Sequence, residues 1–189
     1  EATTRRLPDL KERHLPENCR ETINTILKET YGYEQFRNLE IYDDLSKGKE
    51  KLCISQGQLI ENVILEAEKA WKSETQVDNI LLTAPTGSGK SLLFQLPAIY
   101  LGKEYNLLTI VVSPLKALIV DQVESLQELG YARVAYASSD LSPEQKMEVY
   151  RQVREGEIDL FYLSPELLLS YDIKHFVGER RIGLVVVDE

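Results

Sequence analysis

The sequence lacks any long hydrophobic run and contains few of the residues that build disulfide or metal sites. No apolar stretch approaches the ~20 residues of a membrane-spanning helix, and the amino-terminal stretch EATTRRLPDLKERHLPENCR is too polar for a signal peptide. The 2 cysteines, Cys19 and Cys53, lack paired spacing and nearby histidines, which argues against a disulfide framework or a zinc site. These absences predict a soluble, globular protein of a reducing compartment, the cytoplasm or a eukaryotic nucleus, with no membrane partner.

An excess of positive charge is also absent. Lysine and arginine number 22 against 31 aspartates and glutamates, which gives a formal net charge of −9. Proteins that bind nucleic acid over a broad surface usually carry a basic face that displaces counterions. Any contact between this chain and nucleic acid is therefore expected to be local.

The sequence divides into two regions of different texture. Residues 1–57 are charged and interrupted, with one helix expected from about Asn18 to Thr30, and predict a small, mainly helical extension. Residues 58–189 predict a second domain, which opens with an amphipathic helix to about Trp71. From Asn79 onward, short apolar runs alternate with helical segments, a pattern typical of an α/β fold with a parallel sheet. The runs TIVV and GLVVV lack polar alternation, so helices are expected on both faces of the sheet.

The expected strands are Ile80–Thr83, Thr109–Ser113, Arg133–Ala137, Leu160–Leu163 and Leu184–Val187. The expected helices between them are Ser91–Tyr100, Lys116–Leu129, Pro143–Arg154 and Glu166–Phe176.

The strongest chemical signal is APTGSGKS, which runs from Ala84 to Ser91 between an expected strand and an expected helix. Glycines let the backbone wrap around a phosphate, with amide hydrogens pointing inward at the positive end of the next helix. Lys90 is expected to pair with the β- and γ-phosphates, and the Ser91 hydroxyl to ligate Mg²⁺. The pattern usually begins with glycine instead of Ala84, and a glycine-rich turn that binds nothing is the alternative. The expected nucleotide-binding residues of this loop are Pro85, Thr86, Gly87, Ser88, Gly89, Lys90 and Ser91.

A second signal is the carboxyl-terminal stretch RIGLVVVDE, an apolar strand that ends in Asp188 and Glu189. A carboxylate at the carboxyl end of a parallel strand reaches the crevice where α/β proteins bind ligands. Asp188 is placed to hold Mg²⁺, and Glu189 to orient and deprotonate an attacking water. Alone, the pattern is more typical of a strand that enters a solvated loop, but the upstream phosphate loop favours the catalytic interpretation.

The segments APTGSGKS, VVSPLKALIVDQV, YLSPELLL and VVVDE resemble, in this order, motifs I, Ia, Ib and II of the superfamily 2 DEAD/DEAH-box helicases. KSLLFQLPAIYL and SPLKALIVDQVESLQELG are similar to the RecQ-like group, and the resemblance covers about Asn79 to Glu189. It implies a P-loop NTPase domain of the RecA-like type that uses ATP and Mg²⁺ and acts on nucleic acid, with DNA favoured over RNA. It also implies a second RecA-like domain in the full-length protein, so a chain cut after motif II is expected to be inactive alone. The alternatives are a nucleotide-dependent clamp, a double-strand translocase without unwinding activity, and a small-molecule kinase.

The resemblance also implies contacts with the nucleic-acid backbone. Loops that follow strand ends offer hydroxyls, helix-start amides and one lysine to phosphates. The alternative is that Ser-Pro before a helix is only an ordinary helix-start signal. The implied contact residues are Ser113, Pro114, Leu115, Lys116, Ser138, Ser139 and the turn Ser164, Pro165 and Glu166.

Two glutamines are candidates for the recognition of adenine. A glutamine amide can pair with both N7 and the N6 amino group of adenine. RecQ helicases place such a glutamine in a segment resembling YGYEQFRNLE, Tyr31–Glu40, but here Glu40 stands in its place and the segment lies far upstream of the phosphate loop. Gln58, near the start of the helix before that loop, is the favoured reader, and Gln56 is its rival. The aromatic segment is then either a structural remnant or a platform for the base.

Overall fold

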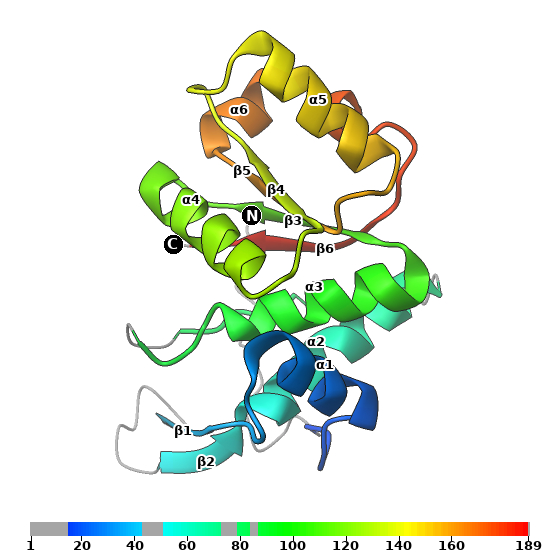
Figure 1. Ribbon diagram of the computed structural model, residues 1–189. Coiled ribbons are helices and arrows are strands. Elements are labelled where there is room, and N and C mark those ends of the chain that lie inside the picture. Colours follow the sequence, from blue (N-terminus) through cyan, green and yellow to red (C-terminus); the bar gives the residue numbers. More distant parts are fainter. Residues whose placement is uncertain (1–14, 43–50, 73–78, 84–86, 189) are drawn as a thin grey trace, which may run out of the picture.

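The computed structural model describes residues 15–42, 51–72, 79–83 and 87–188. Within these residues, the centre of the molecule is a four-stranded parallel sheet in the order β4-β5-β3-β6, and a two-stranded antiparallel hairpin, β1–β2, lies apart from it (Figure 1). Helices cover both faces of the sheet, as unbroken apolar strands predict. The predicted α/β fold is therefore confirmed.

The sheet separates two apolar cores, because neighbouring residues of a strand point to opposite faces. On one face, Val111 and Tyr162 belong to the larger core, and on the other, Ile110 and Phe161 belong to the smaller one. The strands are β3 (Leu108–Val112), β4 (Val134–Ala137), β5 (Leu160–Leu163) and β6 (Ile182–Val187). The larger core is covered by α3 (Leu92–Tyr105) and α4 (Lys116–Glu128), with α1 (Glu21–Tyr31) and α2 (Gln56–Trp71) packed outside α3. The smaller core is covered by α5 (Pro143–Arg154), α6 (Pro165–Ser170) and α7 (Ile173–Val177).

Two expected elements differ from the structure. The expected helix over Glu166–Phe176 is two short helices, because the Asp172 side chain accepts a hydrogen bond from the Lys174 amide at 2.8 Å and starts α7. Residues Ile80–Thr83 form no strand, since a strand requires a neighbour that pairs its backbone. A cavity lies instead between this segment and β6, and Leu81 is 75% exposed.

The hairpin of β1 (Asn38–Tyr42) and β2 (Lys51–Ser55) was not expected. Its strands pair in register from Asn38 opposite Ser55 to Tyr42 opposite Lys51. The residues that flank the pair also meet, since the Gln56 amide donates to the Arg37 carbonyl at 2.9 Å. The chain therefore leaves the domain after Arg37 and returns to the same point at Gln56.

A charged cluster fixes the amino-terminal segment on the domain. Arg20 forms ion pairs with Glu61 at 2.6 Å and with Glu68 at 2.7 Å, and donates a hydrogen bond to the Tyr100 hydroxyl. Burial opposes ionisation of Glu68, but hydrogen bonds from Arg20 and neighbouring tyrosines outweigh it and leave its pKa below the ordinary value. Burial, with the nearby charge of Glu61, raises the pKa of the Cys19 thiol to about 12. Cys19 is therefore an unreactive packing residue.

A second charged cluster closes the amino-terminal edge of the sheet. Asp159 is fully buried immediately before β5. Its carboxylate accepts hydrogen bonds from Tyr131 at 3.1 Å, from Arg133 at 2.6 Å and from Arg180 at 2.9 Å. A Cβ on Gly102 would lie 2.3 Å from this carboxylate, so only glycine fits at that point of α3. The buried charge is thus compensated on several sides.

In the described part of the chain, no helix has the length and apolar character needed to cross a membrane. No group of three or more His, Cys, Asp and Glu side chains in the same residues could hold a metal ion.

Candidate nucleotide and nucleic-acid site

The carboxyl ends of all four parallel strands meet at one edge of the sheet. Ser113 follows β3, Ser138 follows β4, Ser164 follows β5 and Asp188 follows β6. Residues of two expected functions, metal ligation and contact with the nucleic-acid backbone, are therefore brought to one edge, where α/β proteins bind their ligands.

The phosphate loop begins the helix that supports this edge. Gly87 and Gly89 have φ angles of 79° and 81°, in the left-handed region that favours glycine. The loop then turns directly into α3, because the Leu93 amide donates to the Lys90 carbonyl at 2.9 Å. The Ser88 hydroxyl is buried and has no hydrogen-bond partner in the described residues. Ala84, Pro85 and Thr86 lie outside the described residues, so the structure leaves their expected roles untested.

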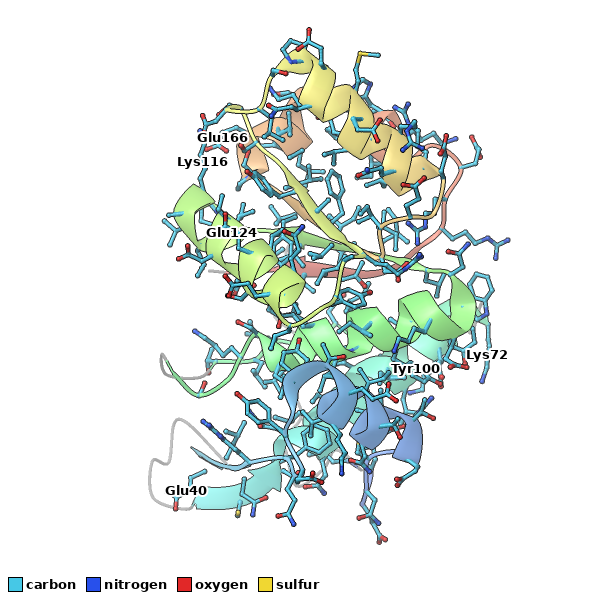
Figure 2. All side chains as sticks on the ribbon, in the orientation of Figure 1. Glu40, Lys72, Tyr100, Lys116, Glu124 and Glu166 are labelled. Carbon is cyan, nitrogen blue, oxygen red and sulfur yellow. The ribbon has the colours of Figure 1, made fainter. Side chains whose placement is uncertain are left out.

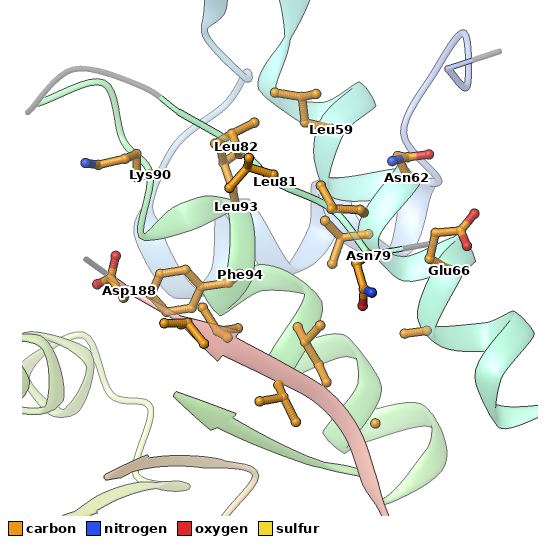
Figure 3. A pocket seen from close by; sticks show the side chains of 18 of the residues that line it. Leu59, Asn62, Glu66, Asn79, Leu81, Leu82, Lys90, Leu93, Phe94 and Asp188 are labelled. Atoms are coloured by element: carbon orange, nitrogen blue, oxygen red, sulfur yellow. The ribbon is translucent and has the colours of Figure 1, made fainter. Parts of the chain in front are cut away.

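Lys90 and Asp188 line the same cavity, and Figure 3 shows both side chains at one end of it. The cavity has a volume of about 390 Å³ and lies between α2, residues 79–82 and β6. Its remaining wall is mainly apolar and includes Leu81, Leu82 and Phe94. Asp188 is held there by its amide, which donates to the Val112 carbonyl at 2.9 Å. Glu189 lies outside the described residues.

A lysine, a hydroxyl and a carboxylate around a glycine loop are the groups that a magnesium nucleotide requires. Mg²⁺ is usually held by one or two protein oxygen ligands together with phosphate oxygens. Ser91 at the start of α3 and Asp188 at the end of β6 could provide the protein ligands. The orphaned Ser88 hydroxyl is a polar group whose burial is unfavourable unless a ligand supplies a partner. These residue types suit ATP·Mg²⁺, and Ser91 lines a hollow separate from the cavity of Lys90 and Asp188.

The two candidate glutamines occupy different environments. Gln58 closes the capping box of α2: its carbonyl oxygen accepts from the Ser55 amide at 3.0 Å, and its Nε2 donates to the Pro16 carbonyl at 3.0 Å. Gln56 is 3% exposed and donates to the Ser88 carbonyl of the phosphate loop at 3.1 Å. Its Oε1 accepts from the Arg37 amide at 3.2 Å. Gln56 contacts the phosphate loop, whereas the amide of Gln58 is bound to the amino-terminal segment.

The β1–β2 hairpin brings together residues that lie far apart in the sequence. The segment that resembles the RecQ adenine motif, Tyr31–Glu40, enters strand β1 after Arg37, and the rest of the hairpin intervenes before Gln56. Arg37 and Gln56 are therefore far apart along the chain but close together in space. The signal that could have revealed this was the pair of short apolar runs NLEIY and KLCIS around Gly48, which is a hairpin pattern.

The expected nucleic-acid residues gather at the same edge of the sheet. Lys116 donates to the Ser139 hydroxyl at 2.5 Å and forms an ion pair with Asp140 at 2.9 Å. The hydrogen bond from Lys116 holds the pKa of the Asp140 carboxyl below its ordinary value. Figure 2 shows Glu166 on the same side of the molecule as Lys116. The one expected lysine is therefore surrounded by acidic groups.

The remaining members of this set differ in exposure. Ser164 caps α6 through the Leu167 amide at 3.4 Å, and the Ser138 hydroxyl accepts from the Asp140 amide at 3.4 Å. The Ser113 hydroxyl is buried without a partner in the described residues. The other three expected residues, all at least partly exposed, are Pro114, Leu115 and Pro165.

Comparison with known proteins identifies the family of the chain. A family model described as DEAD/DEAH box helicase matches residues 64–189. The chain is similar to the ATP-dependent DNA helicase RecQ of Synechocystis sp., with 32% identity over 172 residues, 90% of this chain and 29% of the relative. The RecQ helicase of Bacillus subtilis is 31% identical over 165 residues, 87% of this chain and 23% of the relative. The chain thus spans less than a third of the length of either relative.

Among solved structures, the chain resembles the DUF1998 helicase MrfA in a crystal structure with DNA and AMPPNP. The TM-score is 0.53 and the sequence identity 21%, over 94% of this chain and 22% of that chain. At this sequence identity, the structural similarity supports the fold and carries no argument about function.

Proposed function

Because the chain belongs to the DEAD/DEAH box helicase family, we propose that it is the first RecA-like motor domain of an ATP-dependent DNA helicase or translocase. The names of the RecQ relatives favour DNA over RNA as the partner. The second RecA-like domain of the longer protein is the expected other half of the motor. The observation that carries the proposal is that Lys90 and Asp188 share one end of a cavity beside the left-handed glycines of the phosphate loop.

Each residue of this edge has a distinct task in nucleotide binding. The Lys90 ammonium contacts the β- and γ-phosphates, and backbone N–H groups of the loop that follows Pro85 surround them. Ser91 and Asp188 are the protein ligands for Mg²⁺, and Glu189 accepts a proton from the attacking water. When bound, Mg²⁺ neutralises charge that develops on the phosphates.

We propose Gln56, instead of Gln58, as the adenine reader. Each polar atom of the Gln56 amide has one protein hydrogen bond in the structure. A glutamine amide has two N–H donors and two acceptor lone pairs, so one donor and one lone pair remain for the two-point match to adenine. The contact of Gln56 with the Ser88 carbonyl also places the reader beside the phosphate loop.

The nucleic-acid backbone is proposed to bind over Lys116 and the serines at the strand ends. Their hydroxyls and the single lysine suit phosphates and offer nothing that distinguishes bases. Because Asp140 and Glu166 lie near Lys116, binding by this domain is expected to be weak and independent of sequence.

Calorimetric titration with ATP, in the presence and absence of Mg²⁺, tests the proposal. Mg²⁺ should strengthen ATP binding to the chain, and Asp188→Asn should remove the part of the affinity that depends on Mg²⁺. Asp140→Asn is the matched control, because that carboxylate lies at the same edge but pairs with Lys116. A chain that binds no ATP, or that binds it equally well without Mg²⁺, would contradict the proposed function.

A further inference from the structure

A line of hydrogen-bonded side chains runs through the core from the amino-terminal helix to Asp188. The Tyr31 hydroxyl donates to Gln95 Oε1 at 2.9 Å, and Gln95 Nε2 donates to the Tyr162 hydroxyl at 3.2 Å. Tyr162 donates in turn to Gln122 Oε1 at 2.9 Å, and Gln122 Nε2 donates to Asp188 Oδ2 at 3.4 Å. The five side chains come from α1, α3, β5, α4 and the end of β6.

The interior of this line is buried, so its polar groups are unfavourable unless each has a partner. Gln95 is 6% exposed and Tyr162 is 1% exposed. Burying an amide or a hydroxyl without a hydrogen bond destabilises a protein more than an apolar side chain of similar size would. Because the line of buried polar groups ends on a candidate metal ligand, packing alone does not explain why these side chains are polar.

The direction of the line determines which group faces Asp188. The Tyr162 oxygen accepts from Gln95, so its single hydrogen is free to be donated to Gln122 Oε1. The Gln122 amide then has only its NH₂ group to offer Asp188. Burial and the negative charge of Asp188 raise the pKa of Tyr162, which keeps the hydroxyl protonated and able to donate.

We propose that Gln122 is a positioning residue, which holds one oxygen of the Asp188 carboxylate and leaves the other oxygen for Mg²⁺. This inference rests on the proposed function, because it takes Asp188 to be the metal-binding carboxylate. Ser91, the second candidate ligand, lines a hollow of about 210 Å³ together with Gln95 and Gln122. The line of side chains therefore borders both candidate protein ligands.

The test is the affinity of a fluorescent ATP analogue measured over a range of free Mg²⁺ concentrations. Gln122→Met keeps most of the side-chain volume but removes the donor, so it should weaken the Mg²⁺-dependent part of the affinity about tenfold, in the range seen for lost outer-shell partners. The affinity without Mg²⁺ should not change. Gln127→Ala is the control, because Gln127 lies on the same helix and its amide donates to the Val134 carbonyl.

The Mg²⁺-dependent and Mg²⁺-independent parts of the affinity separate the two possible roles of Gln122. A role in packing alone would weaken both parts equally. Thermal unfolding of each variant establishes that it is folded.

Three outcomes contradict the inference, and they are distinguishable. If Gln122→Met keeps the Mg²⁺ dependence while Asp188→Asn loses it, the proposed function stands and Gln122 has no positioning role. If Gln122→Met loses equal affinity with and without Mg²⁺, its role is structural. If the unaltered chain shows no Mg²⁺-dependent binding, the proposed function fails and the inference fails with it.

Discussion

The two edges of the parallel sheet differ in how their buried groups are paired. At the amino-terminal edge, the buried Asp159 carboxylate is surrounded by donors from Tyr131, Arg133 and Arg180. At the carboxyl-terminal edge, the hydroxyls of Ser88 and Ser113 are buried without partners in the described residues. At the amino-terminal edge, Arg180 Nε and the Thr109 hydroxyl are also buried without partners in the described residues, but the charge of Asp159 is paired. Paired buried charges stabilise a fold, and an unsatisfied hydroxyl at a binding edge can be satisfied by a ligand. The comparison predicts that changes at the first edge affect stability and changes at the second affect binding.

The largest effect is expected at the amino-terminal edge. Asp159→Ala leaves Arg180, which is almost fully buried, without its counter-charge, and should lower the free energy of unfolding by about 3–5 kcal/mol. Urea unfolding followed by circular dichroism measures this. The exposed pair of Glu148 with Arg151 is the control, and Glu148→Gln should leave stability unchanged. An equally stable Asp159→Ala would remove the distinction between the two edges.

At the carboxyl-terminal edge, Lys90→Ala should affect binding without affecting stability. A charge-assisted contact with phosphate contributes about 1.5–3 kcal/mol, so ATP·Mg²⁺ affinity should fall by roughly 10- to 100-fold. Lys103→Ala, at the other end of α3, is the matched control and should bind as the unaltered chain does. Calorimetry and thermal unfolding measure both properties. A Lys90→Ala chain that binds ATP normally would refute the phosphate assignment.

The two glutamines at the start of α2 allow effects on binding and on stability to be compared within one helix. Gln56→Ala should lose the preference for ATP over GTP, by about 1–3 kcal/mol for a two-point base contact. Gln58→Ala should keep that preference and lose stability, by about 0.5–2 kcal/mol for a lost helix cap. Competition between ATP and GTP for the fluorescent nucleotide, with thermal unfolding alongside, measures both. The reverse result would make Gln58 the adenine reader.

The smallest effect is expected for DNA, because the contact surface is small and partly neutralised. Lys116→Ala should reduce the slope of log affinity against log salt concentration by about one unit. Asp140→Asn should strengthen binding, because it releases Lys116 from its ion pair. Fluorescence anisotropy with labelled single strands of different sequence measures both effects. An unchanged slope, or a strong sequence preference, would exclude Lys116 as a main phosphate contact.

The sequence predicted the elements whose signal is local. The buried strands β3 and β5 appear as apolar runs, and so does β6, although Val185 and Val187 of β6 are exposed. The phosphate loop appears as spaced glycines. Ile80–Thr83 has an equally apolar composition but no strand, because pairing depends on a neighbour that composition cannot reveal. The contact of Gln56 with the phosphate loop could not be predicted for a similar reason. Gln56 lies beside Ser88 because β1 and β2 pair with each other and bring the chain back to the domain at Gln56.

The tertiary hydrogen bonds and ion pairs of side chains were the property that the sequence predicted least well. The expected phosphate-binding lysine, Lys116, is paired with Asp140 from the loop after β4, a contact that no local pattern indicates. Likewise, Gln122 lies 66 residues before Asp188, and only the packing of α4 on the sheet brings the two together. The sequence identifies residue types that suit a function, and tertiary contacts decide which of them are available.

The β1–β2 hairpin makes the chain modular at one point. Arg37 and Gln56 are hydrogen-bonded at its base, so the hairpin leaves and rejoins the domain at one point. Closing a flexible loop that is twice as long costs only about 0.6 kcal/mol in entropy. The segment beyond the base can therefore vary in length, or carry a fused reporter, while Gln56 stays against the phosphate loop.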